Sequence, residues 1–206
     1  MIPLKNAFLV ASRVVELLYP YCDRIDIAGS IRREKYQVKD IEIVCQPKKE
    51  LKKDPSKLFD DGEWLVVDEF ELQIDYISSA VEKGNVNGRM MKLILKNGMP
   101  LDLFMPHPSD YIRQLVIRTG SADYVHHVIA VGWKQLGWCG TADGLRLINE
   151  SVGKQTQDGK TVWRCTSSKP TLPPLWETEE QFFKWLGIPF TPPRLREITQ
   201  YSNIAR

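Results

Sequence analysis

The stretch AGSIRREKYQVKDIEIV, from Ala28 to Val44, joins a glycine-serine turn and two adjacent arginines to a charged strand. Apolar and polar residues alternate in its second half, so Asp40 and Glu42 leave the predicted strand on the same face. Cations and carboxylates this close together have two interpretations. One is an ordinary charged turn that leads into a strand, and the other is a site for a triphosphate and its metal ions.

The composition is typical of a globular protein. Its 206 residues fit one domain or two small ones, and the 43% that are hydrophobic are enough for a core. No apolar run approaches the length of a membrane span, and residues 5–19 have the pattern of an amphipathic helix, not of a signal peptide. Four widely spaced cysteines without a CxxC pair argue against a zinc site or a disulfide framework. The expected location is therefore the reducing cytoplasm, with no membrane partner.

The charge is unevenly distributed, although the net charge of +2 is too small to indicate a nucleic-acid-binding protein by itself. Residues 46–57 contain five lysines and two acids, whereas residues 60–82 contain eight acids and no base. Solvated surfaces account for both runs. If one of them is a binding patch, the lysine run is the one that suits a phosphate backbone.

Hydrophobic periodicity predicts a mixture of helices and strands. The Asn97-Gly98 pair between two strand-like runs is a strong hairpin signal. Strands are predicted over 24–28, 39–45, 89–95 and 100–105, and a charged loop over 46–63. Helices are predicted over 5–19, 74–83, 122–136 and 177–186 and after a Ser109 cap, with loops and short strands over 141–175.

A third carboxylate, Asp102, lies in a later predicted strand between Leu101 and Leu103. Three carboxylates on one sheet face repel one another, and two Mg²⁺ ions are a usual solution because these cations prefer oxygen ligands. Such a pair, about 3.5–4 Å apart, can activate an attacking hydroxyl and stabilise a leaving pyrophosphate. The Gly29-Ser30 turn can reach phosphate oxygens, and an arginine beside it can bind phosphate through two donors.

The segment GSIRREKYQVKDIEIV resembles the signature of the nucleotidyltransferase superfamily, and its double arginine and ten-residue gap from Ser30 to Asp40 resemble DNA polymerase family X. Three later segments are similar to that family: LDLFMPHPSDYIRQLVIRTGSADYVHHV (101–128), KQLGWCGTADGLRL (134–147) and TEEQFFKWLGIPFTPPRLRE (178–197). The last segment is the most specific, because no chemistry demands it. The resemblance spans about residues 5–197, nearly the whole chain.

The resemblance implies an α+β fold with two parts. Residues 1–108 are expected to form a catalytic palm, a mixed sheet with flanking helices. Residues 109–206 are expected to form a small C-terminal α/β subdomain that binds nucleotide. The chain is similar to the minimal forms of the family found in viruses and phages, without the N-terminal lyase and helix-hairpin-helix domains. A monomer inside the cell is the expected state.

The family pattern also implies the site residues. Two Mg²⁺ ions, replaceable by Mn²⁺, would bind the catalytic carboxylates Asp40, Glu42 and Asp102, and Asp102 would help to deprotonate the primer 3′-hydroxyl. The nucleotide contacts implied are Gly29, Ser30, Arg33, the backbone of Lys39, Arg118, Thr119, Gly120 and Ser121, although a surface salt bridge is an equal alternative for Arg118. The DNA contacts expected are Lys48, Lys49, Lys52, Lys53, Arg194 and Arg196.

The chain departs from the family pattern in several places. Glu42 stands where an aspartate is usual, and Ile117 and Arg118 stand where aromatic residues are usual. Pro100 and Phe104 replace arginines beside the third carboxylate. These departures bear on metal binding, on the choice between deoxyribose and ribose, and on contacts to the primer end.

The function expected from the resemblance is template-directed DNA synthesis from nucleoside triphosphates on a primer in gapped DNA, in short-gap repair. Two alternatives within the superfamily are a terminal transferase that ignores the template or accepts ribonucleotides, and an enzyme that modifies a small molecule, tRNA or protein. A third alternative is a binding module without catalysis. The presence of Ser30 and all three carboxylates argues against that last alternative.

Overall fold

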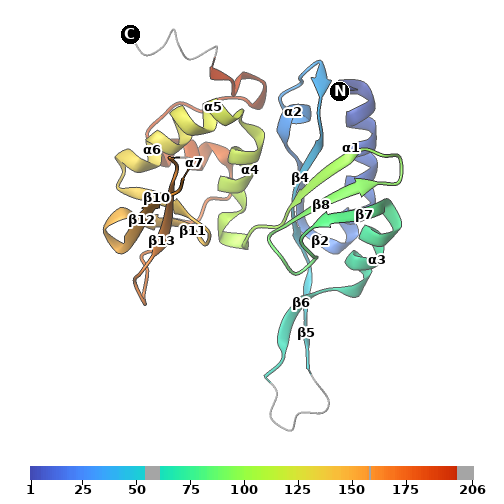
Figure 1. The fold of residues 1–206 in the computed structure, drawn as a ribbon, viewed down its shortest axis with the longest axis horizontal. Coiled ribbons are helices and arrows are strands. Elements are labelled where there is room, and N and C mark those ends of the chain that lie inside the picture. The colour runs from blue at the N-terminus through green and yellow to red at the C-terminus, as the bar shows by residue number, and fades with distance from the viewer. Residues whose placement is uncertain (54–60, 158, 199–206) are drawn as a thin grey trace. The chain divides into compact units, whose positions relative to one another are not determined.

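The computed structural model describes residues 1–53, 61–157 and 159–198, and the chain divides into two compact units (Figure 1). The first unit is Met1–Thr119 and the second is Gly120–Arg206. The sequence placed this boundary after residue 108. The structure places it later because helix α4 (Tyr111–Thr119) packs on the sheet of the first unit.

A mixed five-stranded sheet forms the centre of the first unit, in the order β2-β4-β9-β8-β7. β4 and β9 are parallel, and the other neighbouring pairs are antiparallel. The strands are β2 (Cys22–Ile27), β4 (Ile41–Pro47), β7 (Ser78–Lys83), β8 (Met90–Leu95) and β9 (Pro100–Phe104). A mixed sheet with flanking helices confirms the α+β class. Its assignment as a nucleotidyltransferase palm stays a prediction.

One face of this sheet is buried in the main core together with helices α1 (Leu4–Leu18) and α3 (Asp68–Ile77). α1 contributes residues at helical spacing: Ala7, Ala11, Val14 and Leu18. Ile41, Ile43 and Cys45 of β4 are fully buried in the same core, which confirms the predicted inward face of this strand. The residues between them therefore point to the opposite face.

Helix α4 covers part of that opposite face. The hydroxyl of Tyr111 donates hydrogen bonds to Asp26 Oδ2 at 2.8 Å and to the carbonyl of Val44 at 3.0 Å. Val44 is completely buried although it alternates with the core residues of β4. Helix α4 thus covers the sheet face at Val44, and the carboxylate positions lie next to the covered area.

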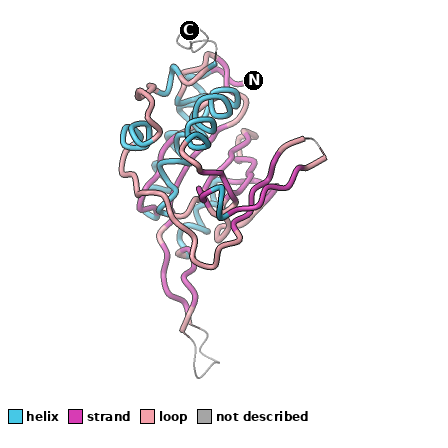
Figure 2. Tube along the Cα trace, turned by 90° about the vertical axis from the view of Figure 1, so that its left-hand side faces the viewer, coloured by secondary structure: helices cyan, strands magenta, loops and turns pink. Residues whose placement is uncertain are grey.

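Two elements of the first unit differ from the sequence-based prediction. The expected helix over 74–83 is the end of α3 followed by β7, and the expected loop over 46–63 contains β5 (Lys49–Lys52) paired with β6 (Glu63–Val66). Figure 2 shows these last two strands side by side. The misassigned strands are largely exposed, so they lack the apolar alternation on which strand prediction depends.

The smaller elements of the first unit connect these parts. They are β1 (Ile2–Pro3), which pairs with β3 (Gln37–Val38), the 3₁₀ turns Tyr19–Tyr21 and Pro108–Asp110, and the short helix α2 (Gly29–Arg32). The Asn97-Gly98 turn joins β8 to β9 as predicted, with Gly98 at a φ of +81°.

The second unit combines helices with a four-stranded mixed sheet in the order β11-β10-β13-β12. Its helical start is α5 (Ala122–Tyr124), a π-helical segment (Val125–Ile129) and α6 (Ala130–Gln135), which together match the helix predicted over 122–136. The strands are β10 (Trp138–Thr141), β11 (Gly144–Leu147), β12 (Ser151–Gln155) and β13 (Thr161–Cys165), with a 3₁₀ turn at Ile148–Glu150. Helix α7 (Glu179–Trp185) and the 3₁₀ turn Pro193–Leu195 follow.

A buried ion pair holds the C-terminal segment of this unit. Arg196 is fully buried, and its guanidinium donates to both carboxylate oxygens of Glu179, at 2.8 and 3.0 Å, and to the carbonyl of Thr191 at 2.9 Å. The prediction that Arg196 contacts DNA is therefore wrong, because its donors face inward. The specific C-terminal ending has a structural role here.

A membrane span requires a helix that is both long and apolar. Within the described ranges, no helix is both long enough and apolar enough to cross a bilayer.

Replacing Arg196 with methionine should destabilise the second unit strongly. The variant leaves the Glu179 carboxylate buried without its cation, which typically costs about 3–5 kcal/mol of unfolding free energy. Tryptophan fluorescence during urea unfolding is a suitable measurement, because five of the six tryptophans belong to this unit.

The matched control is Arg194→Met, since Arg194 is exposed two residues away. This change should alter the unfolding free energy by no more than about 0.5 kcal/mol. Equal stability of the Arg196 and Arg194 variants would contradict a structural role for the buried pair.

Candidate functional site

The strand register of the first unit builds a row of charged side chains across three neighbouring strands. Glu42 on β4 lies opposite Asp102 on β9, and Asp102 lies opposite Lys92 on β8. Neighbouring strands are about 4.8 Å apart, so two carboxylates and one ammonium group share a small area of the same face. We call Glu42, Asp102 and Lys92 the carboxylate row.

Asp40 precedes β4 by one residue and is half-buried beside the row. Its charge acts on Glu42, whose pKa is raised from 4.5 to about 7. Burial is the largest cause of this rise, the charge of Asp40 is the next, and Asp102 adds to it, whereas Arg33 and Arg118 oppose it. The row therefore places Glu42 where burial and neighbouring carboxylates disfavour its ionised form.

The glycine-serine turn is built directly against Glu42. The backbone N–H of Ala28 donates to the carbonyl of Glu42 at 2.8 Å. Gly29 has a φ of +63°, and a Cβ atom there would lie 2.0 Å from Glu42 Oε2 and 2.8 Å from Glu42 Cδ. Glycine is thus required both by the backbone conformation and by the space that the Glu42 side chain occupies.

The two arginines of this segment bind the end of helix α4. Arg32 Nη1 donates to Thr119 Oγ1 at 2.9 Å, and Arg33 Nη1 donates to the carbonyl of Thr119 at 2.6 Å. Thr119 is completely buried. The structure therefore brings together Gly29, Arg33 and Thr119, three of the residues predicted to bind nucleotide, and fixes the turn to the helix end.

Arg118 brings another positive charge to the same face. Its guanidinium carbon lies 4.0 Å from the ring centroid of Phe104, which follows Asp102 by two residues on β9. Burial lowers the pKa of Arg118, while the charges of Glu42 and Asp102 favour its charged form. Of the two interpretations left open by the sequence, the surface salt bridge does not fit this half-buried position over an aromatic ring.

Lys92 is the site residue that sequence reasoning missed. Its Nζ lies 3.0 Å from Asp102 Oδ2, and this hydrogen bond is the main cause of its raised pKa. The signal was present in the sequence, because a hairpin centred on Asn97 pairs residue 92 with residue 102. Both strands were predicted from the sequence, but the pairing of these two residues was not.

The other residues predicted to contact nucleotide are divided between the two units. Ser30 is half-buried in α2, and Lys39 is exposed in the bend before β4. Gly120 and Ser121 belong to the second unit, where the Ser121 hydroxyl accepts a hydrogen bond from the N–H of Tyr124 at 3.2 Å and caps α5. Their contribution to nucleotide binding stays a prediction.

The predicted DNA contacts differ in their availability. Lys52 is paired with Asp68 and Glu50, and Lys48 donates to the carbonyl of Pro20 at 2.8 Å. Lys49, Lys53 and Arg194 are exposed. The lysine run continues into residues 54–60, which lie outside the described part of the chain.

The chemistry of the row suits a divalent cation, because Glu42 and Asp102 offer carboxylate oxygens from opposed positions. The three-carboxylate cluster expected from the sequence is not assembled. Among the residues that the structure describes, no group of three or more His, Cys, Asp or Glu side chains is close enough to hold a metal ion. Asp102 Oδ2 is engaged by the ammonium group of Lys92 instead.

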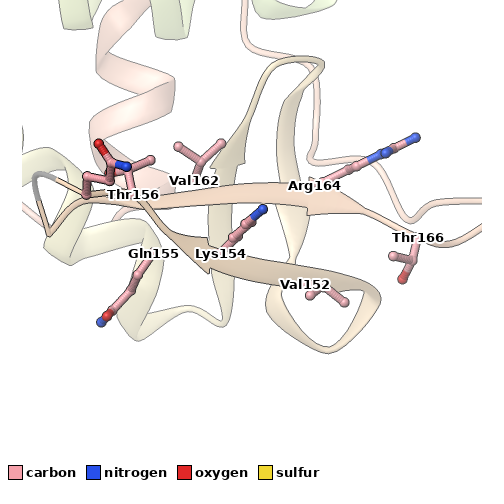
Figure 3. Close-up of a pocket in the computed structure, with 8 residues that line it drawn as sticks. Val152, Lys154, Gln155, Thr156, Val162, Arg164 and Thr166 are labelled. Carbon is pink, nitrogen blue, oxygen red and sulfur yellow. The ribbon is translucent and has the colours of Figure 1, made fainter.

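A hollow of about 1020 Å³ on the β12–β13 hairpin has a different character. Figure 3 shows its lining, in which Lys154 and Arg164 alternate with Val152 and Val162. Its described lining contains no carboxylate, histidine or cysteine, so this hollow offers no side chain suited to acid-base or metal chemistry.

Comparison of the chain with models of protein families and with curated proteins finds no match. Any functional conclusion therefore depends on the chemistry of the carboxylate row and on the sequence pattern around it.

Replacing Gly29 with alanine should displace Glu42 and destabilise the first unit. The left-handed backbone costs an alanine about 1–2 kcal/mol, and the contact with the Glu42 side chain adds to this cost. The control is Gly98→Ala, because Gly98 also has a positive φ but an added Cβ there meets no atom within 4 Å. Chemical unfolding followed by circular dichroism should show a larger loss for Gly29→Ala, and equal losses would contradict the close approach to Glu42.

The stability of the metal-free protein should fall as the pH rises from about 5 to 7. The folded state holds the proton of Glu42 up to a pKa of about 7, whereas the unfolded chain releases it near 4.5, so the folded state binds more protons between these values. The loss amounts to at most about 3 kcal/mol. Urea unfolding in EDTA measures it.

The Glu42→Gln variant isolates this effect, because it keeps the shape of the side chain and removes its titration. Its unfolding free energy should change less with pH over the same interval. Identical pH profiles for the variant and the original chain would show that Glu42 does not cause the decrease.

Proposed function

We propose that this protein is a Mg²⁺-dependent nucleotidyltransferase of the family X type, which adds deoxynucleotides to a primer 3′-hydroxyl under the direction of a template. The observation that carries the proposal is the opposition of Glu42 and Asp102 on adjacent parallel strands, with the Gly29 turn built against Glu42. The family X resemblance of the sequence supplies the reaction. Filling of short gaps in DNA repair is the corresponding biological role.

In this proposal, Asp40, Glu42 and Asp102 would hold the metal ions, which would have to draw together three carboxylates that do not form a metal-binding group in the free protein. When bound, these ions would supply charge stabilisation of the attacking and leaving oxygens. The carboxylates would position the ions, and Asp102 would assist the deprotonation of the primer hydroxyl. Burial of Glu42 lowers the local dielectric response, which strengthens electrostatic interactions with a substrate at this position.

The triphosphate would lie beside the turn that follows β2. Ser30 offers a hydroxyl and Arg33 a guanidinium there. Arg33 already uses Nη1 to bind the Thr119 carbonyl, and this bond holds the planar group in a defined orientation. Preorganised donors of this kind bind phosphate at a smaller entropic cost than mobile ones.

The DNA partner has some support on the surface of the first unit. A hollow of about 500 Å³ is lined by Trp64, Lys49, Arg89 and Asp23, among others, and Trp64 is 62% exposed. An exposed aromatic ring beside cations is the combination that binds unpaired bases and their phosphates. Lys49, one of the lysines predicted to bind DNA, lies in the lining of this hollow.

The test is extension of a labelled primer in a one-nucleotide gap, with each deoxynucleotide or ribonucleotide offered singly in Mg²⁺. We expect incorporation of the base complementary to the template. Asp102→Asn should lower the rate at least about a hundredfold by removing a charged ligand of the same shape. The control Asp75→Asn, at an exposed position of α3, should leave the rate unchanged.

Other outcomes select the alternatives. Incorporation without regard to the template identifies a terminal transferase, and incorporation of ribonucleotides identifies tolerance of the 2′-hydroxyl. Nucleotide binding without any extension identifies a binding module. Equal rates for the Asp102 and Asp75 variants would overturn the proposed site.

A further inference from the structure

The carboxylate row contains a lysine directly beside Asp102, the residue proposed as a metal ligand. Lys92 Nζ lies 3.0 Å from Asp102 Oδ2, and the two side chains are 43% and 16% exposed. The pair is fixed by register, because Lys92 and Asp102 are directly opposed on antiparallel strands. Lys92 is therefore a regular neighbour of Asp102, not a chance contact of a long surface side chain.

The charges around the row are nearly balanced before any ligand binds. The negative charges belong to Asp40, Glu42 and Asp102. Two positive charges, those of Arg33 and Arg118, act on Glu42 and favour its ionised form. Lys92 contributes a third positive charge directly at Asp102. A divalent cation that approaches this group meets little net negative charge to attract it.

We propose that Lys92 is the resident counter-cation of Asp102 and competes with the divalent cation for this carboxylate. The inference rests on the proposed function, because it assumes that Asp102 is a metal ligand. A metal ion that binds Asp102 must share or displace the ammonium group. The free protein should therefore bind the metal weakly.

Nucleotide changes this balance. A triphosphate beside the row adds negative charge, which attracts the metal and offers the released lysine a new partner. Metal binding should consequently be tighter in the presence of nucleotide than in its absence, and Lys92 should be a cause of that difference. By reciprocity, the metal strengthens nucleotide binding by the same factor.

The experiment measures Mn²⁺ binding to the free protein by the loss of the electron paramagnetic resonance signal of free Mn²⁺. Lys92→Met should bind Mn²⁺ roughly three- to tenfold more tightly, the size of one partly exposed charge interaction. Lys92→Arg keeps the positive charge and should bind as the original chain does. In an Asp102→Asn background, the gain from Lys92→Met should disappear.

The matched control is Lys96→Met. Lys96 lies on the same hairpin and its Nζ is 5.0 Å from the ring centroid of Tyr76, so the variant removes an equal charge elsewhere in the unit. Its Mn²⁺ affinity should not change. An equal gain in the Lys96 and Lys92 variants would show a general charge effect and overturn the inference.

The two levels of the proposal fail in different ways. If the original chain binds no Mn²⁺ even with a deoxynucleoside triphosphate, the metal site and the inference about Lys92 fall together. If it binds Mn²⁺ with nucleotide and Lys92→Met leaves the affinity of the free protein unchanged or weaker, only the competition is refuted. Circular dichroism of each variant verifies that the sheet is intact.

Discussion

The register between β4 and β9 is the constraint on which the site depends. The apolar residues of β4 can be buried only if this strand presents Ile41, Ile43 and Cys45 to α1 and α3. A shift by one residue would place Glu42 in the core, at a cost far greater than any gain in the sheet. Hydrophobic burial on one face therefore forces Glu42 and Asp102 together on the other face, despite their repulsion.

Positively charged side chains in the rest of the site offset that repulsion. Arg118 acts from the last turn of α4, Arg33 from the end of α2, and Lys92 from the neighbouring strand. These elements come from separate parts of the sequence, and two of them are joined because Arg33 and Arg32 bind Thr119. The cations thus stabilise the arrangement of the turn and the helix as well as the charge of the carboxylates.

Sequence patterns predicted those parts of the fold that have a local cause. The two faces of β4, the Asn97-Gly98 hairpin and helix α1 follow from alternation, turn chemistry and helical periodicity. β7 was missed because its exposed residues carry no such pattern. The partner of Lys92 follows from the register of the Asn97-Gly98 hairpin. The role of Arg196 depends on a partner 17 residues away, and a charged side chain shows no local sign of being buried.

Glu42 stands where an aspartate is usual in family X, and its longer side chain lies against Gly29. The two nearest atoms to a Cβ placed on Gly29 are Oε2 and Cδ of Glu42, which an aspartate does not have. The longer carboxylate thus reaches over the turn and occupies the space that a side chain at position 29 would fill. Because Gly29 also needs its positive φ, the turn satisfies a backbone requirement and a side-chain requirement with the same residue. The length of Glu42 therefore adds to a restriction at Gly29 that the positive φ and the Cβ atom of residue 42, 3.0 Å from the same point, also impose. The close approach places the carboxylate beside the turn proposed to bind the triphosphate.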